Sequence, residues 1–359
     1  MLPDGRRLGA HLPLGGGMVK AVERAHAIGA TALQVFGDNP TAWRRRAEPP
    51  REQPAFREKL RELDIGPVAV HAAYLVNLAG RQADFFERSV EVLKHDVDGA
   101  PGFGARFVNV HAGSHRGAGR ILGAAYLAEG VHRVLSETGG GPDAPRLVIE
   151  NSAGGGDTMG STLEELAEIA EAIAGQRVAP ARVGFCVDAA HAWGAGYRIS
   201  EPEEVDVLVE RFDALIGLDR LAMVHLNDTR SGLGSRTDRH EHIGAGQIGE
   251  AGLRRLLVHP RLGGVTYILE TPGMEDGYDA INVARALDLA AGGSLAPLPP
   301  EAFELRRDSS RVAPAEAVDE PDGAGANPHE RADAPQDGDE AEQPAPQAVP
   351  APAPAPTRA

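Results

Sequence analysis

The sequence predicts an α/β fold, a TIM (β/α)₈ barrel over residues 1–295, followed by a disordered acidic tail rich in Pro and Ala. A short apolar strand, a turn and an amphipathic helix alternate eight times, and eight strands close a parallel sheet into this barrel. The strands are rich in Val, Ile, Leu or Phe, as expected when both faces of a sheet are buried. Polar residues collect at the strand ends. An open doubly wound sheet is the alternative for this pattern.

The predicted strands are short runs rich in Val, Ile, Leu or Phe, bounded by turn residues. In chain order they are Leu8–His11, Ala32–Phe36, Val68–His71, Phe107–His111, Leu147–Glu150, Val183–Asp188, Met223–Leu226 and Tyr267–Glu270. Helical patterns fill the intervals between them. A capping box from Ser161 to Glu164 opens one helix, and a second box from Ser200 to Glu203 opens the next, with Pro202 in its first turn. Further helices are predicted at Gly17–Ile28, Phe85–Val97 and Asp279–Ala291.

The composition is that of a globular protein with a single cysteine. The chain has 359 residues, of which 42% are hydrophobic, and this is enough to bury a sizeable core. It contains no apolar run of about 18 residues and no secretory signal, so we expect no membrane partner. Because Cys186 is the only cysteine, no intramolecular disulfide can form, and we expect a cytoplasmic location. We also expect a monomer.

The formal net charge of −16 argues weakly against nucleic acid as a partner, but the charge is unevenly spread. Residues 301–359 hold 13 acidic and 5 basic residues. We predict that residues 296–359 are a disordered, low-complexity tail, because this composition buries too little apolar surface to offset the entropy of ordering. In the predicted barrel domain, divalent metals bound to carboxylates would remove part of the negative charge.

Histidine and carboxylate residues stand at most of the predicted strand ends, on the face where TIM barrels build active sites. Seven lie at or just after a strand end and two follow in the next loop: His71, His111, Glu150, Asp188, His191, His225 and Glu270, with Asp238 and His240. A lone strand-end histidine is usually a structural group, but this many clustered carboxylates would repel one another without cations. Zinc binds both imidazole and carboxylate ligands, and manganese can also bind them. Nine ligands are too many for one ion, so their number indicates two or three ions.

These segments resemble the endonuclease IV family of apurinic/apyrimidinic (AP) endonucleases along almost the whole of residues 5–292. The matching stretches contain the candidate ligands and their neighbours: Gly9–His11, His71–Ala79, Asn109–His115, Ile149–Gly154, Cys186–His191, His225–Asp228 and Gly234–Gly249. Each stretch is a weak signal alone. Together, in this order and at these intervals, they are highly specific.

The resemblance implies a DNA repair enzyme that hydrolyses double-stranded DNA on the 5′ side of an abasic site, leaving a 3′-hydroxyl and a 5′-deoxyribose phosphate. It implies three Zn²⁺ ions. The ligands of the three ions would be His71, His111 and Glu150; then Glu150, Asp188, His225 and Glu270; and finally His191, Asp238 and His240. We expect Glu150 to be the catalytic residue, orienting the attacking water.

Four residues are candidate DNA contacts. Tyr74 and Leu75 match family residues that insert beside the missing base, where an aromatic or apolar side chain replaces lost stacking. Packing of its own loop is the alternative role for Tyr74. Arg236 and Arg239 flank Asp238 and are candidates for phosphate contacts, although a structural salt bridge is an equal expectation for them.

Two positions depart from the pattern of the family. Thr41 stands where the family often has an arginine that wedges into the DNA, and the neighbouring run from Arg44 to Arg46 is a candidate replacement. Ala112 stands where a proline usually follows the second histidine ligand; this change touches no ligand.

Two other functions stay open at this point. A sugar isomerase or epimerase of the xylose isomerase-like group shares the barrel but needs one or two ions, so the third ligand group would be surplus. The second open function is a barrel that binds DNA or metal without cleaving DNA. The complete ligand set argues against this function. His11, His115 and His242 are expected either to orient ligands or to have structural roles, and Cys186 is expected in the core.

Overall fold

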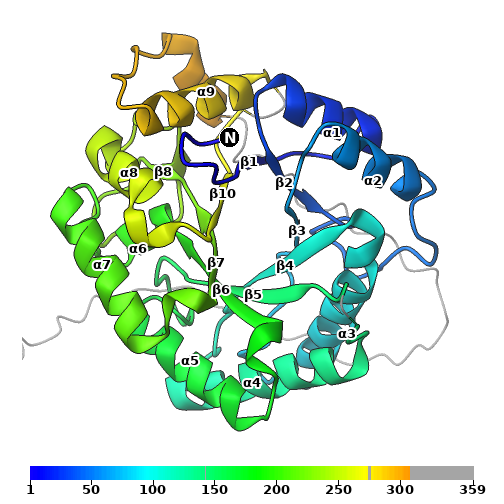
Figure 1. Ribbon diagram of the computed structural model, residues 1–359. Helices are drawn as coiled ribbons and strands as arrows, with labels where there is room; N and C mark the ends of the chain where they lie inside the picture. The colour runs from blue at the N-terminus through cyan, green and yellow to red at the C-terminus, as the bar shows by residue number, and fades with distance from the viewer. Residues whose placement is uncertain (142, 274–275, 308–359) are drawn as a thin grey trace, which may run out of the picture. The chain divides into compact units, whose positions relative to one another are not determined.

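The computed structural model describes residues 1–307 except 142 and 274–275. Its central element is a closed barrel of eight parallel strands in the order β1-β10-β7-β6-β5-β4-β3-β2, surrounded by helices (Figure 1). The strands are β1 (Leu8–His11), β2 (Ala32–Phe36), β3 (Val68–His71), β4 (Ala105–His111), β5 (Arg146–Glu150), β6 (Val183–Asp188), β7 (Leu221–His225) and β10 (Thr266–Leu269). The predicted TIM barrel is confirmed, and the open doubly wound sheet was the wrong alternative.

Helices follow the strands around the outside of the barrel. They are α1 (Met18–Ala27), α2 (Gln53–Glu62), α3 (Ala83–Gly99), α4 (Arg120–Glu137), α5 (Leu163–Gly175), α6 (Ala189–Gly194), α7 (Pro202–Leu215), α8 (Gly249–Val258) and α9 (Tyr278–Ala290). Short 3₁₀ helices are η1 (Ala100–Phe103), η2 (Pro180–Arg182), η3 (Leu218–Arg220), η4 (Pro260–Leu262) and η6 (Pro300–Arg307). Within the described ranges, no helix has the length and apolarity needed to span a bilayer.

The helix starts differ slightly from the predicted capping boxes. The N-cap of α5 is Thr162 rather than Ser161, and its hydroxyl accepts a hydrogen bond from the Glu165 backbone N–H at 3.2 Å. The Glu165 carboxylate in turn accepts from the Ser161 backbone N–H at 2.8 Å. At α7 the predicted Ser200 box is wrong, because Glu201 is the N-cap and makes no side-chain cap hydrogen bond. The predicted box is thus displaced by one residue at α5 and absent at α7.

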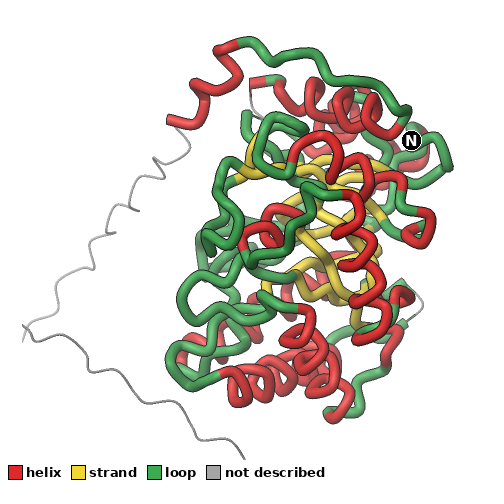
Figure 2. The backbone as a smooth tube through the Cα atoms, turned by 90° about the vertical axis from the view of Figure 1, so that its left-hand side faces the viewer, coloured by secondary structure: helices red, strands yellow, loops and turns green. Residues whose placement is uncertain are grey.

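Long loops follow the carboxyl ends of the strands, and Figure 2 shows loops gathering at one end of the barrel. The loop after β7 contains a small antiparallel hairpin, formed by β8 (Asp228–Thr229) and β9 (His240–Glu241). The buried Asp228 carboxylate anchors this loop, since it accepts hydrogen bonds from the backbone N–H groups of Thr229, Gly246 and Ile248 at 2.8–3.0 Å. The hairpin is therefore fixed at the end of the barrel where the strand-end histidines lie.

Below those strand-end residues, the inside of the barrel is closed by a small apolar cluster. Most of its members stand two residues before a polar residue of the strand end, so both point inward, because side chains alternate along a strand. The cluster comprises Ala32, Ala69, Phe107, Val148, Cys186, Ala222, Met223 and Ile268. Cys186 is fully buried among these side chains, as predicted.

The described chain continues past residue 295, where the barrel domain is predicted to end. Past that point, Ala302 is fully buried and its carbonyl accepts a hydrogen bond from His242 Nε2 at 2.9 Å. The Ala296 carbonyl accepts a hydrogen bond from the buried Arg285 at 2.6 Å. The predicted tail from residue 308 onward lies outside the described residues.

These contacts predict a difference between two truncations. Ending the chain after Leu295 would remove one acceptor each from the buried His242 and Arg285, so we expect the free energy of unfolding to fall by roughly 2–5 kcal/mol. Ending it after Arg307 keeps both acceptors and should leave the melting temperature almost unchanged. Thermal and urea denaturation of the two truncated chains beside the full chain would test this. Equal stability of the two truncations would contradict it.

Candidate metal centre

The structure brings all nine candidate ligands to one mouth of the barrel. Seven lie at the ends of β3 to β7, directly after β10, or in the first turn of α6, which follows β6 without a loop. The β8–β9 hairpin supplies the remaining two. Their donor atoms form three groups that could each hold a metal ion: His71, His111 and Glu150; Glu150, Asp188, His225 and Glu270; and Asp188, His191 and His240.

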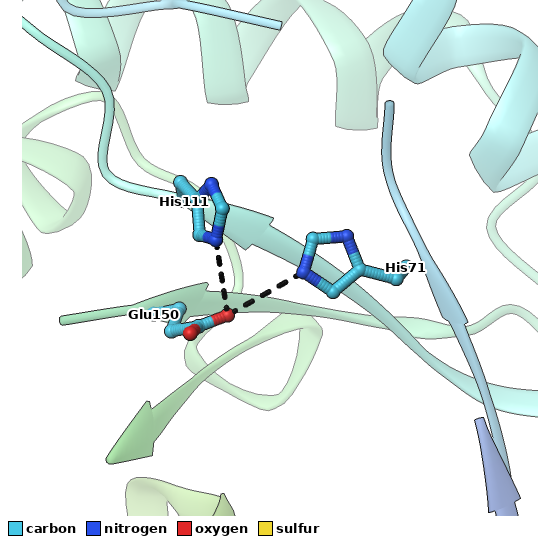
Figure 3. A group of neighbouring side chains, drawn as sticks. All are labelled: His71, His111 and Glu150. Carbon is cyan, nitrogen blue, oxygen red and sulfur yellow. Dashed lines mark ion pairs between the residues drawn. The ribbon is translucent and has the colours of Figure 1, made fainter. Parts of the chain in front are cut away.

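In the first group two imidazoles converge on one carboxylate oxygen (Figure 3). The distances to Glu150 Oε2 are 3.6 Å from His71 Nε2 and 3.7 Å from His111 Nε2. His71 Nδ1 donates a hydrogen bond to the Ala72 carbonyl at 2.7 Å, so its Nε2 is left with a free lone pair. Two ligands about 2.1 Å from one tetrahedral ion lie roughly 3.4 Å apart, so these separations suit a shared ion better than direct hydrogen bonds.

In the second group His225 Nδ1 faces three carboxylates. It lies 3.4 Å from Glu150 Oε1, 3.8 Å from Asp188 Oδ2 and 3.3 Å from Glu270 Oε2. Its other nitrogen, Nε2, lies 3.2 Å from the side-chain oxygen of Gln34. Both His225 Nδ1 and Glu150 Oε1 are buried without a hydrogen-bond partner among the described residues. Orphaned buried polar atoms are rare, and a bound cation would satisfy both of them.

The third group joins α6 to the β8–β9 hairpin. His191 Nε2 lies 3.2 Å from Asp238 Oδ2, and His240 Nε2 lies 3.1 Å from Asp238 Oδ1. The other nitrogens of these two rings contact backbone carbonyls, of Asn151 at 3.0 Å and Glu270 at 2.7 Å. Asp188 Oδ2 is 3.7 Å from His240 Nε2, so both Asp188 and Asp238 lie within reach of an ion held here.

The electrostatics of the centre favour cations. Burial raises the pKa of the Asp188 carboxyl. Burial also opposes ionisation of Glu150, but the imidazoles of His225 and His111 outweigh it and hold the pKa of Glu150 well below its usual range. Glu150 and Asp188 are almost fully buried and stand within one cluster. Charged carboxylates so placed need compensating positive charge, which divalent ions supply.

Four buried amide side chains orient these ligands, and the sequence analysis assigned them no role. Asn109 Nδ2 donates to Glu150 Oε2 at 2.5 Å, and Asn227 Nδ2 donates to Asp188 Oδ2 at 2.6 Å. Gln34 Nε2 donates to Glu270 Oε1 at 2.6 Å. Asn151 Oδ1 accepts a hydrogen bond from the Asp188 backbone N–H, also at 2.6 Å. An amide inside or directly after an apolar strand, in phase with a ligand, is the signal that could have revealed them.

Three histidines with an expected orienting or structural role, His11, His115 and His242, have different surroundings. His11 Nδ1 lies 3.4 Å from Glu270 Oε1, so it fits the predicted orienting role. His115 accepts a hydrogen bond from the Gly119 backbone N–H before α4, and its Nε2 is 3.9 Å from Asp157. His242 is buried between Asn282 and Ala302 and has a structural role.

Beside the metal centre lies a cavity of about 460 Å³, whose lining includes His111, His191 and Asp238. Tyr74, Leu75 and Arg236 also line it. Tyr74 is 58% exposed, and its ring stacks at 6.3 Å on His111 and packs edge-on against Phe36 at 5.2 Å. Arg239 is exposed outside this lining. Within the described residues neither Arg236 nor Arg239 forms a salt bridge, so the structural alternative predicted for them is not observed.

The run from Arg44 to Arg46, in the loop after β2, leaves one arginine exposed without a structural contact. Thr41 caps its own turn, since its hydroxyl donates to Asn39 Oδ1 at 2.9 Å. Arg45 donates to the backbone carbonyls of Asn39 and Ala42, and Arg46 pairs with Asp38 at 3.4 Å. Arg44 has no side-chain hydrogen bond or ion pair within the described part of the chain, so it is the arginine of this run best placed to meet a ligand.

The fold and this cluster define a TIM-barrel protein with a histidine–carboxylate metal centre at the carboxyl ends of its strands. Residues 22–290 match the family described as xylose isomerase-like TIM barrel. The chain belongs to the endonuclease IV family within that group. It is 36% identical to a probable endonuclease 4 of Halothermothrix orenii over 282 residues, and this alignment covers 78% of this chain and 99% of the relative. It is 40% identical over 291 residues to one of Oleidesulfovibrio alaskensis, covering 80% and 96%.

Solved structures agree with this membership. The crystal structure of endonuclease IV from Thermus thermophilus superposes with a TM-score of 0.69 and 39% identity, covering 80% of this chain and 99% of that one. A D-tagatose 3-epimerase-like protein superposes with a TM-score of 0.57 but only 17% identity, covering 85% and 99%. The second similarity shows the shared barrel alone.

Proposed function

We propose that the protein is a DNA repair endonuclease that hydrolyses the phosphodiester 5′ to an abasic site, leaving a 3′-hydroxyl and a 5′-deoxyribose phosphate. The observation that carries this proposal is the convergence of three metal-binding groups that share Glu150 and Asp188. Relatives that are 36–40% identical over nearly their whole length carry the name probable endonuclease 4, which supports the proposal. The expected cytoplasmic location and monomeric state stay predictions.

The donor set fits three divalent ions, and we propose zinc, with manganese as the substitute. The residues that would hold them are the three groups described above, with Asp238 added to His191 and His240. Bound ions would supply Lewis acidity to the phosphate oxygens and lower the pKa of water toward about 7. A site with so many buried ligands is built for more than one ion, as multinuclear phosphodiester hydrolysis requires.

The protein's own residues would position the reaction. Asn109 fixes one oxygen of Glu150, so the other, Oε1, is directed at His191 and His225 from distances of 3.3 and 3.4 Å. We assign Glu150 the role of orienting the attacking water beside the phosphorus. Asn227 holds Asp188 and also accepts the Glu270 backbone N–H at 2.8 Å, so one amide keeps two ligands in register.

A sugar isomerase or epimerase with one divalent ion is the competing function. The group of Asp188, His191 and His240 favours the nuclease, because proton transfer between sugar carbons gives no role to this further ligand set. The similarity to an epimerase-like barrel is confined to the fold. Metal analysis of the pure protein distinguishes the two, with about three ions per chain expected for the nuclease and one for the isomerase.

Recognition of the abasic site is proposed to use Tyr74 and Leu75, with Arg236 and Arg239 at phosphates. Tyr74 is exposed beside the cavity, so its ring is available to stack where the base is missing. We expect Tyr74→Ala to raise KM for abasic duplex roughly 10–100-fold, corresponding to the loss of one base–aromatic stack, with a smaller effect on kcat.

Tyr74→Phe is the matched control, because it keeps the ring and its contact with Phe36. It should bind abasic duplex almost as well as the parent protein. If Tyr74 served only to pack its own loop, Tyr74→Ala would lower the melting temperature without this selective rise in KM. Steady-state kinetics and thermal denaturation of the two variants separate these roles.

One experiment tests the activity directly. The protein is incubated with a duplex that carries a single tetrahydrofuran abasic analogue, with and without a chelator, and the cut is mapped. A lyase cannot cleave this analogue by β-elimination, so a chelator-sensitive cut on its 5′ side with a 3′-hydroxyl product establishes hydrolysis. No cleavage by fully metal-loaded protein would refute the proposal.

A further inference from the structure

The end of the barrel opposite the metal centre is lined with arginines. Five of the eight strands have an arginine at or within one residue of their first position: Arg7 before β1, Arg106 in β4, Arg146 in β5, Arg182 before β6 and Arg220 before β7. Because all strands are parallel, their first residues share one end of the barrel. This N-terminal mouth is thus basic in a chain whose net charge is −16.

The mouth contains a cavity of about 400 Å³. Arg6, Arg7, Arg106 and Arg146 line it, and Asp219 is the only carboxylate among its described lining residues. Arg6 is paired with Asp4 and Arg7 with Asp64, the latter at 3.0 Å. These two arginines therefore have structural partners, and the question concerns the other cations of the mouth.

Arg106, Arg146 and Arg220 form no salt bridge within the described ranges of the chain. Arg146 makes only two long contacts, of 3.4 Å, to the Asp219 backbone carbonyl. The Nε atoms of Arg146 and Arg220 are buried without a hydrogen-bond partner among the described residues. The Arg106 guanidinium lies over the Phe107 ring at 5.6 Å, which leaves its N–H donors open. Arg106 and Arg146 thus line one cavity with unused donors, whereas Arg220 lies outside its lining, with its guanidinium over the Phe185 ring at 5.0 Å.

The fold makes room for this arrangement. Arg146 stands two residues before Val148 of the apolar cluster, so its side chain enters the barrel from the N-terminal mouth. On the neighbouring strand a Cβ at Gly184 would lie 2.8 Å from Arg146 Nε, so only glycine leaves the guanidinium this position. Burial lowers the pKa of Arg146, and the positive charge of Arg220 lowers it further. A protein that holds like charges together in this way gains from an anion that binds between them.

We propose that the N-terminal mouth is a second ligand site, which binds the phosphate group of a small molecule between Arg106 and Arg146. Guanidinium groups present planar forks of N–H donors that match phosphate oxygens in pairs. The cavity volume lies in the range of small-molecule sites, and its concave walls suit a compact anion such as phosphate or a nucleoside monophosphate. The apolar cluster separates this site from the metal centre, so it is independent of the proposed nuclease activity.

Calorimetric titration of metal-loaded protein with inorganic phosphate and, separately, with AMP tests the proposal. The metal centre also attracts phosphate, so the diagnostic signal is the binding that substitutions in the mouth remove. Arg106→Ala and Arg146→Gln should each weaken this binding at least about tenfold, while cleavage of abasic duplex stays unchanged. Arg88→Ala, an exposed arginine of α3 without an ion pair within the described residues, is the matched control and should bind as the parent does.

Each outcome decides the question. Equal loss of phosphate and AMP binding means that the phosphate group alone is recognised, and tighter binding of AMP means that the cavity also holds the nucleoside; both support the site. Thermal denaturation verifies that the variants are folded, and Arg106→Ala, an exposed position, provides the test if Arg146→Gln is unstable. Unchanged binding in folded Arg106→Ala, or no binding beyond the metal centre, overturns the proposal.

Discussion

Glu150→Gln is expected to reduce the turnover of abasic duplex by roughly 1000-fold or more, equivalent to about 4 kcal/mol of transition-state stabilisation. Glu150 belongs to two of the three metal groups, and its buried Oε1 faces His191 and His225. An amide keeps the size of the side chain and can still accept the hydrogen bond from Asn109. It replaces the other oxygen by an NH₂ group, which can neither bind a cation nor carry the negative charge.

Single-turnover kinetics at saturating DNA would measure this effect, with circular dichroism to verify the fold. Glu171→Gln, an exposed glutamate on α5, removes the same charge away from the site and should leave turnover unchanged. Metal analysis of the Glu150→Gln variant shows whether the loss of turnover comes from lost ions or, with the ions still bound, from lost positioning of the water. Turnover near that of the parent protein would remove Glu150 from the reaction.

Removal of the metal ions is expected to have the second large effect, a loss of cleavage below detection that zinc or manganese restores. Glu150, Asp188 and His225 are almost completely buried, so without cations their crowded charges and lone pairs are uncompensated. Dialysis against a chelator, metal analysis and titration back would show whether activity returns as about three ions bind. Full cleavage by protein with less than one ion per chain would contradict the metal-dependent mechanism.

The stability of the metal-free protein should also depend on pH differently from that of the metal-loaded protein. Burial lowers the pKa of His240, but the carboxylates of Asp238 and Asp188 outweigh it and raise this pKa to about 9. A raised histidine pKa stabilises the fold fully below the unfolded value of about 6.5, and this stabilisation is lost as the pH rises through about 9. The melting temperature of metal-free protein should therefore fall between these pH values more steeply than that of metal-loaded protein. Parallel curves for the two forms would refute this prediction.

Sequence patterns predicted the barrel because its determinants are local and repeated. All eight strands were placed within two residues, since each is an apolar run between turn residues. The strand-end ligands could be predicted because parallel strands bring their carboxyl ends to one face, whatever the intervening helices do. The position of the first helical residue was predicted less well: Thr162 rather than Ser161 caps α5, and the Ser161 backbone N–H instead donates to the Glu165 carboxylate.

The orienting amides could not be predicted in the same way. Gln34 contacts Glu270 and His225 across sequence separations of 236 and 191 residues, so its role depends on closure of the barrel. The arginines of the N-terminal mouth could not be related to one another for a similar reason. Arg106 and Arg146 are far apart along the chain, and each alone is an ordinary strand-start cation; only the shared cavity relates them.

The apolar cluster inside the barrel has a consequence for how the molecule can change. It is an apolar partition, formed by buried residues such as Val148, Met223 and Ile268, between the opening with the histidine–carboxylate groups and the opening with the arginines. Because the cluster contains no charged side chain, neither opening needs to match the other in charge. Substitutions can accumulate at the basic opening while the acidic one keeps its ligands, and each end can acquire chemistry of its own.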